Sequence, residues 1–191
     1  MKVIGFTGNY GMEVNNPQCY LMPDSAILYT GRPFFIPDFA RHFVATPSIV
    51  VRTGRLGKCI ASKFAHRYWD ALTAAFSVKA CYSDDPRVEG LDRAFDGAAI
   101  VGEWIEHDGL DDPMHATVSL AVNGEVVANR CLGDMQQPLD EMIAAVSSRC
   151  SIKMGDMIFT GDAGLGHQLA PGDRLTATIG GQPVLDVKVK L

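Results

Sequence analysis

The closing stretch of the chain, residues 147–191, constrains the fold most, because specific chemistry marks its turns. Three Gly-Asp pairs punctuate it, at Gly155-Asp156, Gly161-Asp162 and Gly172-Asp173. Glycine adopts positive φ without steric conflict, and an aspartate side chain can bond the backbone that follows it. The segments between these turns are short, and either apolar or alternating, as strands are. We therefore expect strands at 157–160, 174–179 and 184–191.

The last of these strands indicates which face is packed. Its apolar side chains occupy every second position, and these are Leu185, Val187, Val189 and Leu191. The positions between them carry Asp186, Lys188 and Lys190. Strict alternation predicts one face in the core and one face in water. Gly180-Gly181 predicts a tight turn that joins this strand to the one before it.

The rest of the chain also indicates short strands. A strand is expected at 3–6, and the prolines between residues 17 and 47 argue against any long helix there. Residues 48–52 predict a strand that Gly54 interrupts and that resumes at 56–61. The clearest hairpin covers 116–130, because Asn123-Gly124 suits a type I′ turn.

Two helices are expected among these strands. The spacing of Trp69, Leu72, Thr73 and Phe76 predicts a helix over 66–76, followed by a strand over 77–82. A second helix opens at Pro138, with two acidic residues in its first turn. Its expected core stripe consists of Leu139, Met142, Ile143 and Val146.

Composition limits the class of protein. With 191 residues, 47% of them apolar, the chain is long enough for one domain over 1–191 with a sizeable core. A net charge of -5 argues against a nucleic-acid partner, and no apolar run reaches the ~20 residues that a membrane helix needs. The five cysteines are scattered and odd in number, which favours reduced thiols over disulfides. We therefore expect a soluble cytoplasmic protein.

The residue pattern of the closing stretch resembles the C-terminal part of proteins in the fumarylacetoacetate hydrolase family. Residues 155–166 read Gly-Asp-Met-Ile-Phe-Thr-Gly-Asp-Ala-Gly-Leu-Gly, and Pro171-Gly172-Asp173 follows. The family pattern is GD-x-I-x-TGTP-x-GVG and then a PGD. Here Asp162-Ala163 replaces the Thr-Pro, and one loop residue is missing. Weaker matches at Gly8-Asn9-Tyr10, 95–104 and 123–125 extend the resemblance over nearly the whole chain.

The resemblance implies a fold and a chemistry. The implied fold is mainly β, of the α+β type, with twisted and rolled mixed sheets, a few short helices and a homodimeric assembly. Members of the family hold Mg²⁺ or Mn²⁺ with an E-x-E pair on one strand and an aspartate on a later strand. Such carboxylates suit a hard cation, which would polarise the keto-enol oxygens of a 2-keto acid or 1,3-diketone.

Laid onto this chain, the implied metal ligands are missing. The E-x-E pair falls at Thr53 and Arg55, and the aspartate falls at Cys81. None of the three is acidic, and a shift by one residue, to Arg52 and Gly54, is no better. Asp84 and Asp85 lie in the loop beyond and are the candidates for a rebuilt site. No metal cofactor is therefore expected.

Two functions remain open at this point. In the first, a degenerate family member keeps only the fold and serves as a non-catalytic binding or structural homodimer. In the second, Arg55 and Arg93, which stands at the family's active-site lysine, form a metal-free pocket for a small anion or keto acid, because guanidinium groups bind carboxylates well. If the protein is an enzyme, it is then a hydrolase or isomerase of a keto acid or diketone. The residues proposed for this pocket are Arg55, Arg93, Cys81, Thr53, Thr160, Gly161 and Asp162.

Overall fold

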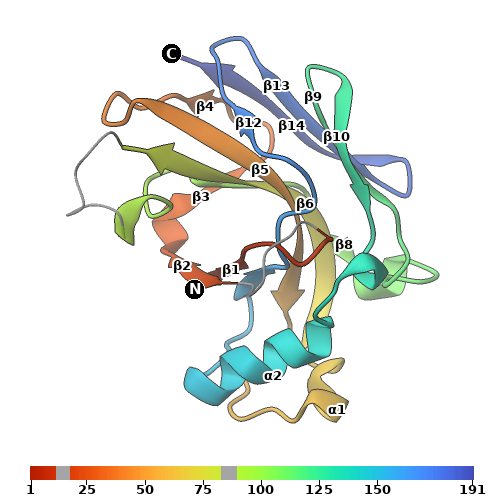
Figure 1. Cartoon of the computed structure of the whole chain (residues 1–191). Coiled ribbons are helices and arrows are strands. Elements are labelled where there is room, and N and C mark those ends of the chain that lie inside the picture. The colour runs from red at the N-terminus through yellow and green to blue at the C-terminus, as the bar shows by residue number, and fades with distance from the viewer. Residues whose placement is uncertain (12–17, 83–89) are drawn as a thin grey trace.

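The computed structural model describes residues 1–11, 18–82 and 90–191, and the strands among them form two sheets (Figure 1). The strands are β1 (Val3–Phe6), β2 (Cys19–Met22), β3 (Ile27–Tyr29), β4 (Phe34–Phe35), β5 (His42–Thr53), β6 (Trp69–Cys81), β7 (Ala99–Val101), β8 (Ile105–Glu106), β9 (Val118–Val122), β10 (Glu125–Arg130), β11 (Met157–Phe159), β12 (His167–Gln168), β13 (Arg174–Ile179) and β14 (Gln182–Lys190). The helices are α1 (Ser62–Ala65), α2 (Leu139–Arg149) and the short 3₁₀ segments η1 (Asp24–Ala26), η3 (His107–Gly109) and η4 (Leu132–Asp134). The expectation of a mainly β fold with few helices is confirmed.

The first sheet is organised around the long β5–β6 hairpin. Within the described residues its strand order is β2-β1-β11-β5-β6-β7-β3, with β12 added beside β5 and β8 beside β6. The second sheet runs β10-β9-β13-β14-β4. Figure 1 shows the second sheet lying across the hairpin. The helices α1 and α2 lie together at the end of the hairpin where β5 connects to β6.

The two faces of the first sheet have different neighbours. Ile49 and Phe76 lie on the face that packs against the second sheet, in one large apolar core. Val50 and Ala75 lie on the other face, in a smaller cluster with β7 and β11. Both faces are therefore buried along the middle of the hairpin, and any polar side chain there must find a partner inside the protein.

The helix predicted over residues 66–76 is wrong. Residues 69–76 belong to β6, a strand of 13 residues that pairs with β5 over its length and with β7 and β8 on its other edge. Helix propensity is a weak preference that tertiary pairing overrides. The alanines that suggested a helix are fully buried and let β6 pack on both faces. The strand predicted at 56–61 is also absent, and Gly57 forms only an isolated bridge to Ile152.

Pro47 lies in the middle of β5, although proline is rare within central strands. Its carbonyl accepts a hydrogen bond from the Ala163 N–H, on the side away from β6. The N–H and C=O of one strand residue point the same way. The missing N–H of Pro47 therefore faces the loop after β11, where the regular ladder is already interrupted.

The elements with strong local signals form as expected. Asn123 and Gly124 have φ of 54° and 86°, and they join β9 to β10. Helix α2 buries the predicted stripe of Leu139, Met142, Ile143 and Val146. The strand β14 alternates as predicted over most of its length, but Leu191 follows the strand and is 85% exposed.

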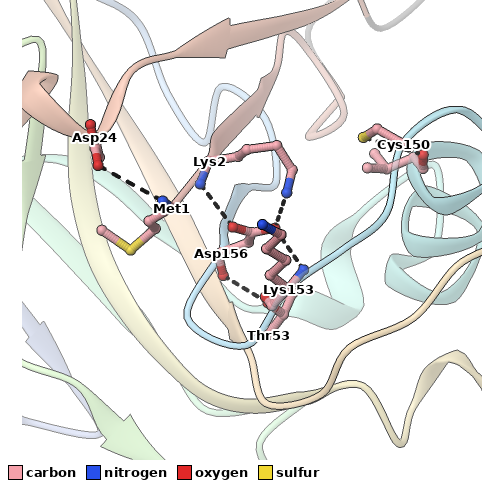
Figure 2. A network of polar contacts seen from close by, with 8 residues as sticks. Met1, Lys2, Asp24, Thr53, Cys150, Lys153 and Asp156 are labelled. Carbon is pink, nitrogen blue, oxygen red and sulfur yellow. Dashed lines mark hydrogen bonds and ion pairs between the residues drawn. The ribbon is translucent and has the colours of Figure 1, made fainter.

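A buried aspartate ties the start of the chain to the region before β11. Asp156 is fully buried, and its carboxylate accepts hydrogen bonds from the backbone N–H of Lys2 and Lys153 at 2.8 Å and from the Lys2 ammonium (Figure 2). Its backbone carbonyl accepts from the Thr53 N–H at the end of β5. One Gly-Asp turn thus fixes three segments that lie far apart in the sequence.

Two further observations concern the helices and the cysteines. The helix α2 has 11 residues, about half the ~20 needed to cross a bilayer, and no helix of the described residues is long and apolar enough to do so. All five cysteines are free.

Candidate functional site

The two glycine-containing motifs at opposite ends of the chain meet in space. Asn9 is buried with φ of 81°, and its side-chain amide donates to the Thr160 carbonyl at 2.8 Å. The Tyr10 hydroxyl bonds the Thr160 hydroxyl at 2.7 Å. The Gly8 N–H donates to the Asp162 carboxylate at 2.9 Å. The segments 8–10 and 160–162 therefore form one interlocked unit.

Gly161 is required by this close approach. Its φ is 133°, and a β-carbon at this position would lie 2.1 Å from the Gly8 carbonyl oxygen. No other residue fits there without moving the backbone of the opposing segment. The glycine thus sets where Asp162, the next residue, projects.

Asp162 has an unusual carboxylate. Burial raises its pKa, and the hydrogen bond from Gly8 and the charge of Arg93 offset part of that rise. A carboxylate with a raised pKa is a stronger base than a free one, which suits proton transfer.

Arg93 is near enough for its charge to act on this carboxylate, and it is held by three contacts. Its Nε–H donates to the Ser77 hydroxyl at 3.3 Å, its guanidinium carbon lies 4.6 Å from the centre of the Tyr20 ring, and its Nη1 is 3.5 Å from the Asp92 carboxylate. Its side chain remains 15% exposed. Among the described residues no hydrogen bond or ion pair joins Arg93 to Asp162.

Tyr20 completes this group. Its hydroxyl bonds the Ser77 hydroxyl at 3.0 Å, and burial raises its pKa. Its ring lies over Gly5 in β1, where a β-carbon would come within 2.1 Å of the ring. A glycine in the middle of this strand thus makes room for the tyrosine.

Three hydroxyl side chains share the sheet face beneath Arg93. Thr46 in β5 is directly opposite Ser77 in β6, and Ser48 is two residues further along β5. Direct cross-strand partners and residues two apart project to the same face. The Ser48 hydroxyl donates to the Gly161 carbonyl at 2.8 Å, which links this face to the Asp162 loop. We call Thr46, Ser48 and Ser77 the hydroxyl face.

The three positions to which the sequence assigned the metal ligands do not lie together. Thr53 pairs with Trp69 at one end of the β5–β6 hairpin, and Cys81 pairs with His42 at the other. The strand β5 has 12 residues, so at about 3.3 Å per residue these ends are about 35 Å apart. Within one chain, Thr53 and Cys81 are therefore too far apart to contribute to one site.

Arg55 also lies away from Arg93. It lines a surface cleft of about 270 Å³ beside α1, with His66, Arg67 and Asp70 among its neighbours. Within one chain, Arg55 and Arg93 therefore do not line the same pocket. Of the residues predicted for it, Arg93, Thr160, Gly161 and Asp162 are brought together around the hydroxyl face.

The sequence reasoning missed Tyr20, Thr46, Ser48 and Ser77. The sequence reasoning aligned the E-x-E pair with Thr53 and Arg55, seven residues beyond Thr46 and Ser48, and it did not recognise the first half of β6 as the strand that pairs with β5. Once β6 is paired with β5, Thr46 and Ser48 lie two residues apart on β5, and Ser77 of β6 lies opposite Thr46. Arg93 bonds Ser77, so all three hydroxyl side chains lie near the guanidinium. This is the arrangement that the family resemblance requires of its metal ligands.

No acidic cluster is found at this face. Within residues 1–11, 18–82 and 90–191, no group of three or more His, Cys, Asp or Glu side chains could hold a metal ion. Asp84 and Asp85, the candidates for a rebuilt site, lie outside the described residues.

His167 has a partner of its own. Its Nε2 lies 2.9 Å from the carboxylate of Asp173, which also accepts from the Asn123 side chain and the Ala170 N–H. Hydrogen bonds from these groups lower the pKa of Asp173 despite its burial. His167 thus serves to fix the turn before β13.

Comparison with known proteins agrees with this architecture. Residues 8–190 match the family model for the C-terminal region of fumarylacetoacetate (FAA) hydrolase. Over 182 residues the chain is 24% identical to a mitochondrial oxaloacetate tautomerase of Rattus norvegicus, covering 93% of this chain and 82% of the relative. Over 105 residues it is 34% identical to a maleylpyruvate hydrolase of Aquipseudomonas alcaligenes, covering 52% and 37%.

Solved structures show the same fold. A fumarylpyruvate hydrolase from Pseudomonas aeruginosa in complex with Mn²⁺ and pyruvate is similar with a TM-score of 0.86 and 20% identity, over 100% of this chain and 90% of that one. A 5-carboxymethyl-2-hydroxymuconate delta-isomerase from Mycobacterium smegmatis is similar with a TM-score of 0.85 and 24% identity, over 99% and 78%. The chain belongs to the fumarylacetoacetate hydrolase family.

Proposed function

We propose that the protein catalyses proton transfer on a small 2-keto acid or 1,3-diketone, at Asp162 and Arg93, without a divalent metal. The observation that carries the proposal is that the Asp162 loop and Arg93 both bond the hydroxyl face, through Ser48 and Ser77, and form no ion pair with each other among the described residues. A base and a fixed cation that do not neutralise each other can act on a molecule held between them. Relatives named as oxaloacetate tautomerases support this class of reaction.

The proposed step is a keto–enol conversion. The Asp162 carboxylate removes the proton from the carbon next to the keto group, and the electron pair of that C–H bond moves to form an enolate. The charge on the enolate oxygen is stabilised by the Arg93 guanidinium. Asp162 then returns the proton to the oxygen, which gives the enol, and the reverse sequence gives the keto form.

The side chains of the hydroxyl face do not fit the metal that the family resemblance implies. Mg²⁺ and Mn²⁺ favour charged oxygen ligands, whereas Thr46, Ser48 and Ser77 are neutral, and Ser77 already bonds a guanidinium. We therefore derive no step through a metal.

The assay uses oxaloacetate, whose enol form is followed by ultraviolet absorbance, in buffer that contains EDTA. We expect the protein to accelerate interconversion, Asp162→Asn to reduce the rate by about 10²–10⁴-fold, and Arg93→Met by about 10²–10³-fold. Arg55→Met, at the far end of the hairpin, is the matched arginine control and should leave the rate unchanged. Turnover that appears only after Mg²⁺ or Mn²⁺ is added would contradict the proposal.

A second candidate function is binding without catalysis. Ser77, Tyr20 and Arg93 already satisfy one another by hydrogen bonds and stacking, and Ser48 bonds the Gly161 carbonyl, as in a structural polar cluster. Saturable binding of oxaloacetate with no acceleration in any metal condition would favour this alternative, a binding or structural protein that keeps only the fold.

We further propose that the protein is a cytoplasmic homodimer. The family resemblance supports the dimer, and five free cysteines support a reducing compartment. Light scattering should give twice the chain mass of 20.7 kDa. A mass of one chain at micromolar concentration would contradict the dimer.

A further inference from the structure

Two cationic side chains, Lys79 of β6 and Arg93, lie close together beside the hydroxyl face. Lys79 and Arg93 both lie near the carboxylate of Asp92, at 3.3 and 3.5 Å. Because Lys79 shares this carboxylate, Arg93 has no ion-pair partner to itself among the described residues. The hydroxyl face beneath Arg93 adds hydrogen-bonding capacity without charge.

The guanidinium of Arg93 is oriented by its surroundings. Ser77 accepts from Nε, and the Tyr20 ring packs against the guanidinium. Tyr20 is itself fixed by its bond to Ser77 and by the space over Gly5. A guanidinium whose Nε edge is occupied and whose face is covered presents its remaining N–H donors in a fixed plane.

We propose that Arg93 is the built-in cation of this site and binds one carboxylate of the ligand, in place of a metal ion, with Tyr20 as its positioning residue. A carboxylate suits this geometry because its two oxygens match the planar donors of arginine. Arginine also stays charged when it is largely buried, so the positive charge needs no loading step. The inference concerns the same site as the proposed function but requires no turnover.

Binding of oxalate tests the inference directly. Oxalate has two carboxylates and no keto group, and its affinity can be measured by calorimetry in EDTA. We expect oxalate to bind the wild-type protein in EDTA, Arg93→Met to weaken it by about 100-fold, and Arg93→Lys by about 10-fold. Arg55→Met serves as the control and should bind like the wild type.

A charge at Ser77 provides a second test that keeps Arg93. Ser77→Asp places a carboxylate against the guanidinium and should compete with the ligand, whereas Ser77→Asn introduces a neutral group of the same shape. We expect oxalate to bind the Asn variant at least about 10-fold more tightly than the Asp variant. Equal affinities would count against the proposal.

A third comparison distinguishes the effect of Tyr20 on oxalate binding from its effect on the stability of the fold. Tyr20→Phe keeps the ring over Arg93 and loses the hydroxyl that bonds Ser77, whereas Tyr20→Leu loses both the ring and the hydroxyl. With melting temperatures measured alongside, we expect oxalate affinity to fall about 10-fold further in the Leu variant than in the Phe variant.

Three results would overturn the inference. These are oxalate binding that requires added Mn²⁺, no oxalate binding in either condition, and unchanged affinity in Arg93→Met. Failure of the proposed function gives a different result. In that case the protein does not accelerate oxaloacetate conversion, but oxalate still binds in EDTA and Arg93→Met still weakens that binding.

Discussion

At the scale of single residues, Asp162 and Asp156 show two uses of the same Gly-Asp signal. Asp156 is fully buried and meets its partners in Lys2 and Lys153, so its charge stabilises the fold. Asp162 accepts one backbone N–H and otherwise faces a guanidinium at a distance. The Asp156 carboxylate has all its hydrogen bonds within the fold and is structural, whereas the Asp162 carboxylate can still accept a proton or a hydrogen bond from a ligand.

The ionisation of Asp162 gives a prediction with a definite sign. The positive charge of Arg93 lowers the pKa of Asp162 against the larger effect of burial. Removing that charge in Arg93→Met should therefore raise the pKa of Asp162 further above its ordinary value. Titration of the carboxyl carbon by NMR would measure the change, and a pKa that falls or stays constant would contradict the proximity of the two groups.

The buried Asp156 carboxylate should be important for stability. Asp156→Ala removes the acceptor for two backbone N–H groups and leaves the Lys2 ammonium without its partner. We expect a loss of about 3–5 kcal/mol in the free energy of unfolding, measured by urea denaturation. Asp96→Ala, at an exposed turn position, is the control and should change it by no more than about 0.5 kcal/mol.

At the scale of elements, the loop after β11 shows how the site is built. Backbone contacts of this loop with β5 and with segment 8–10 hold Asp162 in place. Neither strand β11 nor the loop could do so alone. The position of the carboxylate depends on how closely two backbones approach, and Gly161 permits that approach.

A graded series of glycine substitutions tests this arrangement. Gly161→Ala combines positive φ with a clash against Gly8 and should lose about 3 kcal/mol of stability. Gly172 has φ of 96° but open space around it, so Gly172→Ala should lose only about 1–2 kcal/mol. Gly90→Ala, with neither constraint, should be neutral. Equal losses at Gly161 and Gly172, from urea denaturation, would show that the clash is relieved.

At the scale of the whole molecule, the first sheet joins the first strand of the chain to a strand in its last third. Strand β1 pairs in parallel with β11, in the register Val3 to Met157, and lies between β11 and β2. The buried side chains of Asn9 and Tyr10 extend this junction into the site. Folding of the first sheet thus depends on contacts between residues about 150 apart in the sequence.

Removal of the first ten residues should abolish cooperative folding. The deletion takes away β1, leaves β2 and β11 without their shared partner, and exposes Asp156 and Thr160. We expect no sharp thermal transition by circular dichroism. Deletion of Leu191, which is 85% exposed and outside β14, should leave the melting curve unchanged. A cooperative transition in the shortened protein would show that the junction is dispensable.

The sequence by itself determined the elements whose information is local. The Asn123-Gly124 turn, the stripe of α2 and the Gly-Asp turns each depend on φ preferences or spacing within a few residues, and each forms as expected. The same local motifs identified Arg93 and Asp162, because one precedes the Phe95-Asp96 pair and the other follows Gly161.

Only the tertiary structure decided the state of β6 and the position of the site. The alanines of β6 favour a helix in isolation, but β5 on one edge and β7 with β8 on the other hold the segment extended. Strand register then set Thr46 opposite Ser77 and separated Thr53 from Cys81. Pairing between distant strands leaves no local mark on the sequence, so the hydroxyl face and its contacts with Tyr20 and Arg93 became visible only in three dimensions.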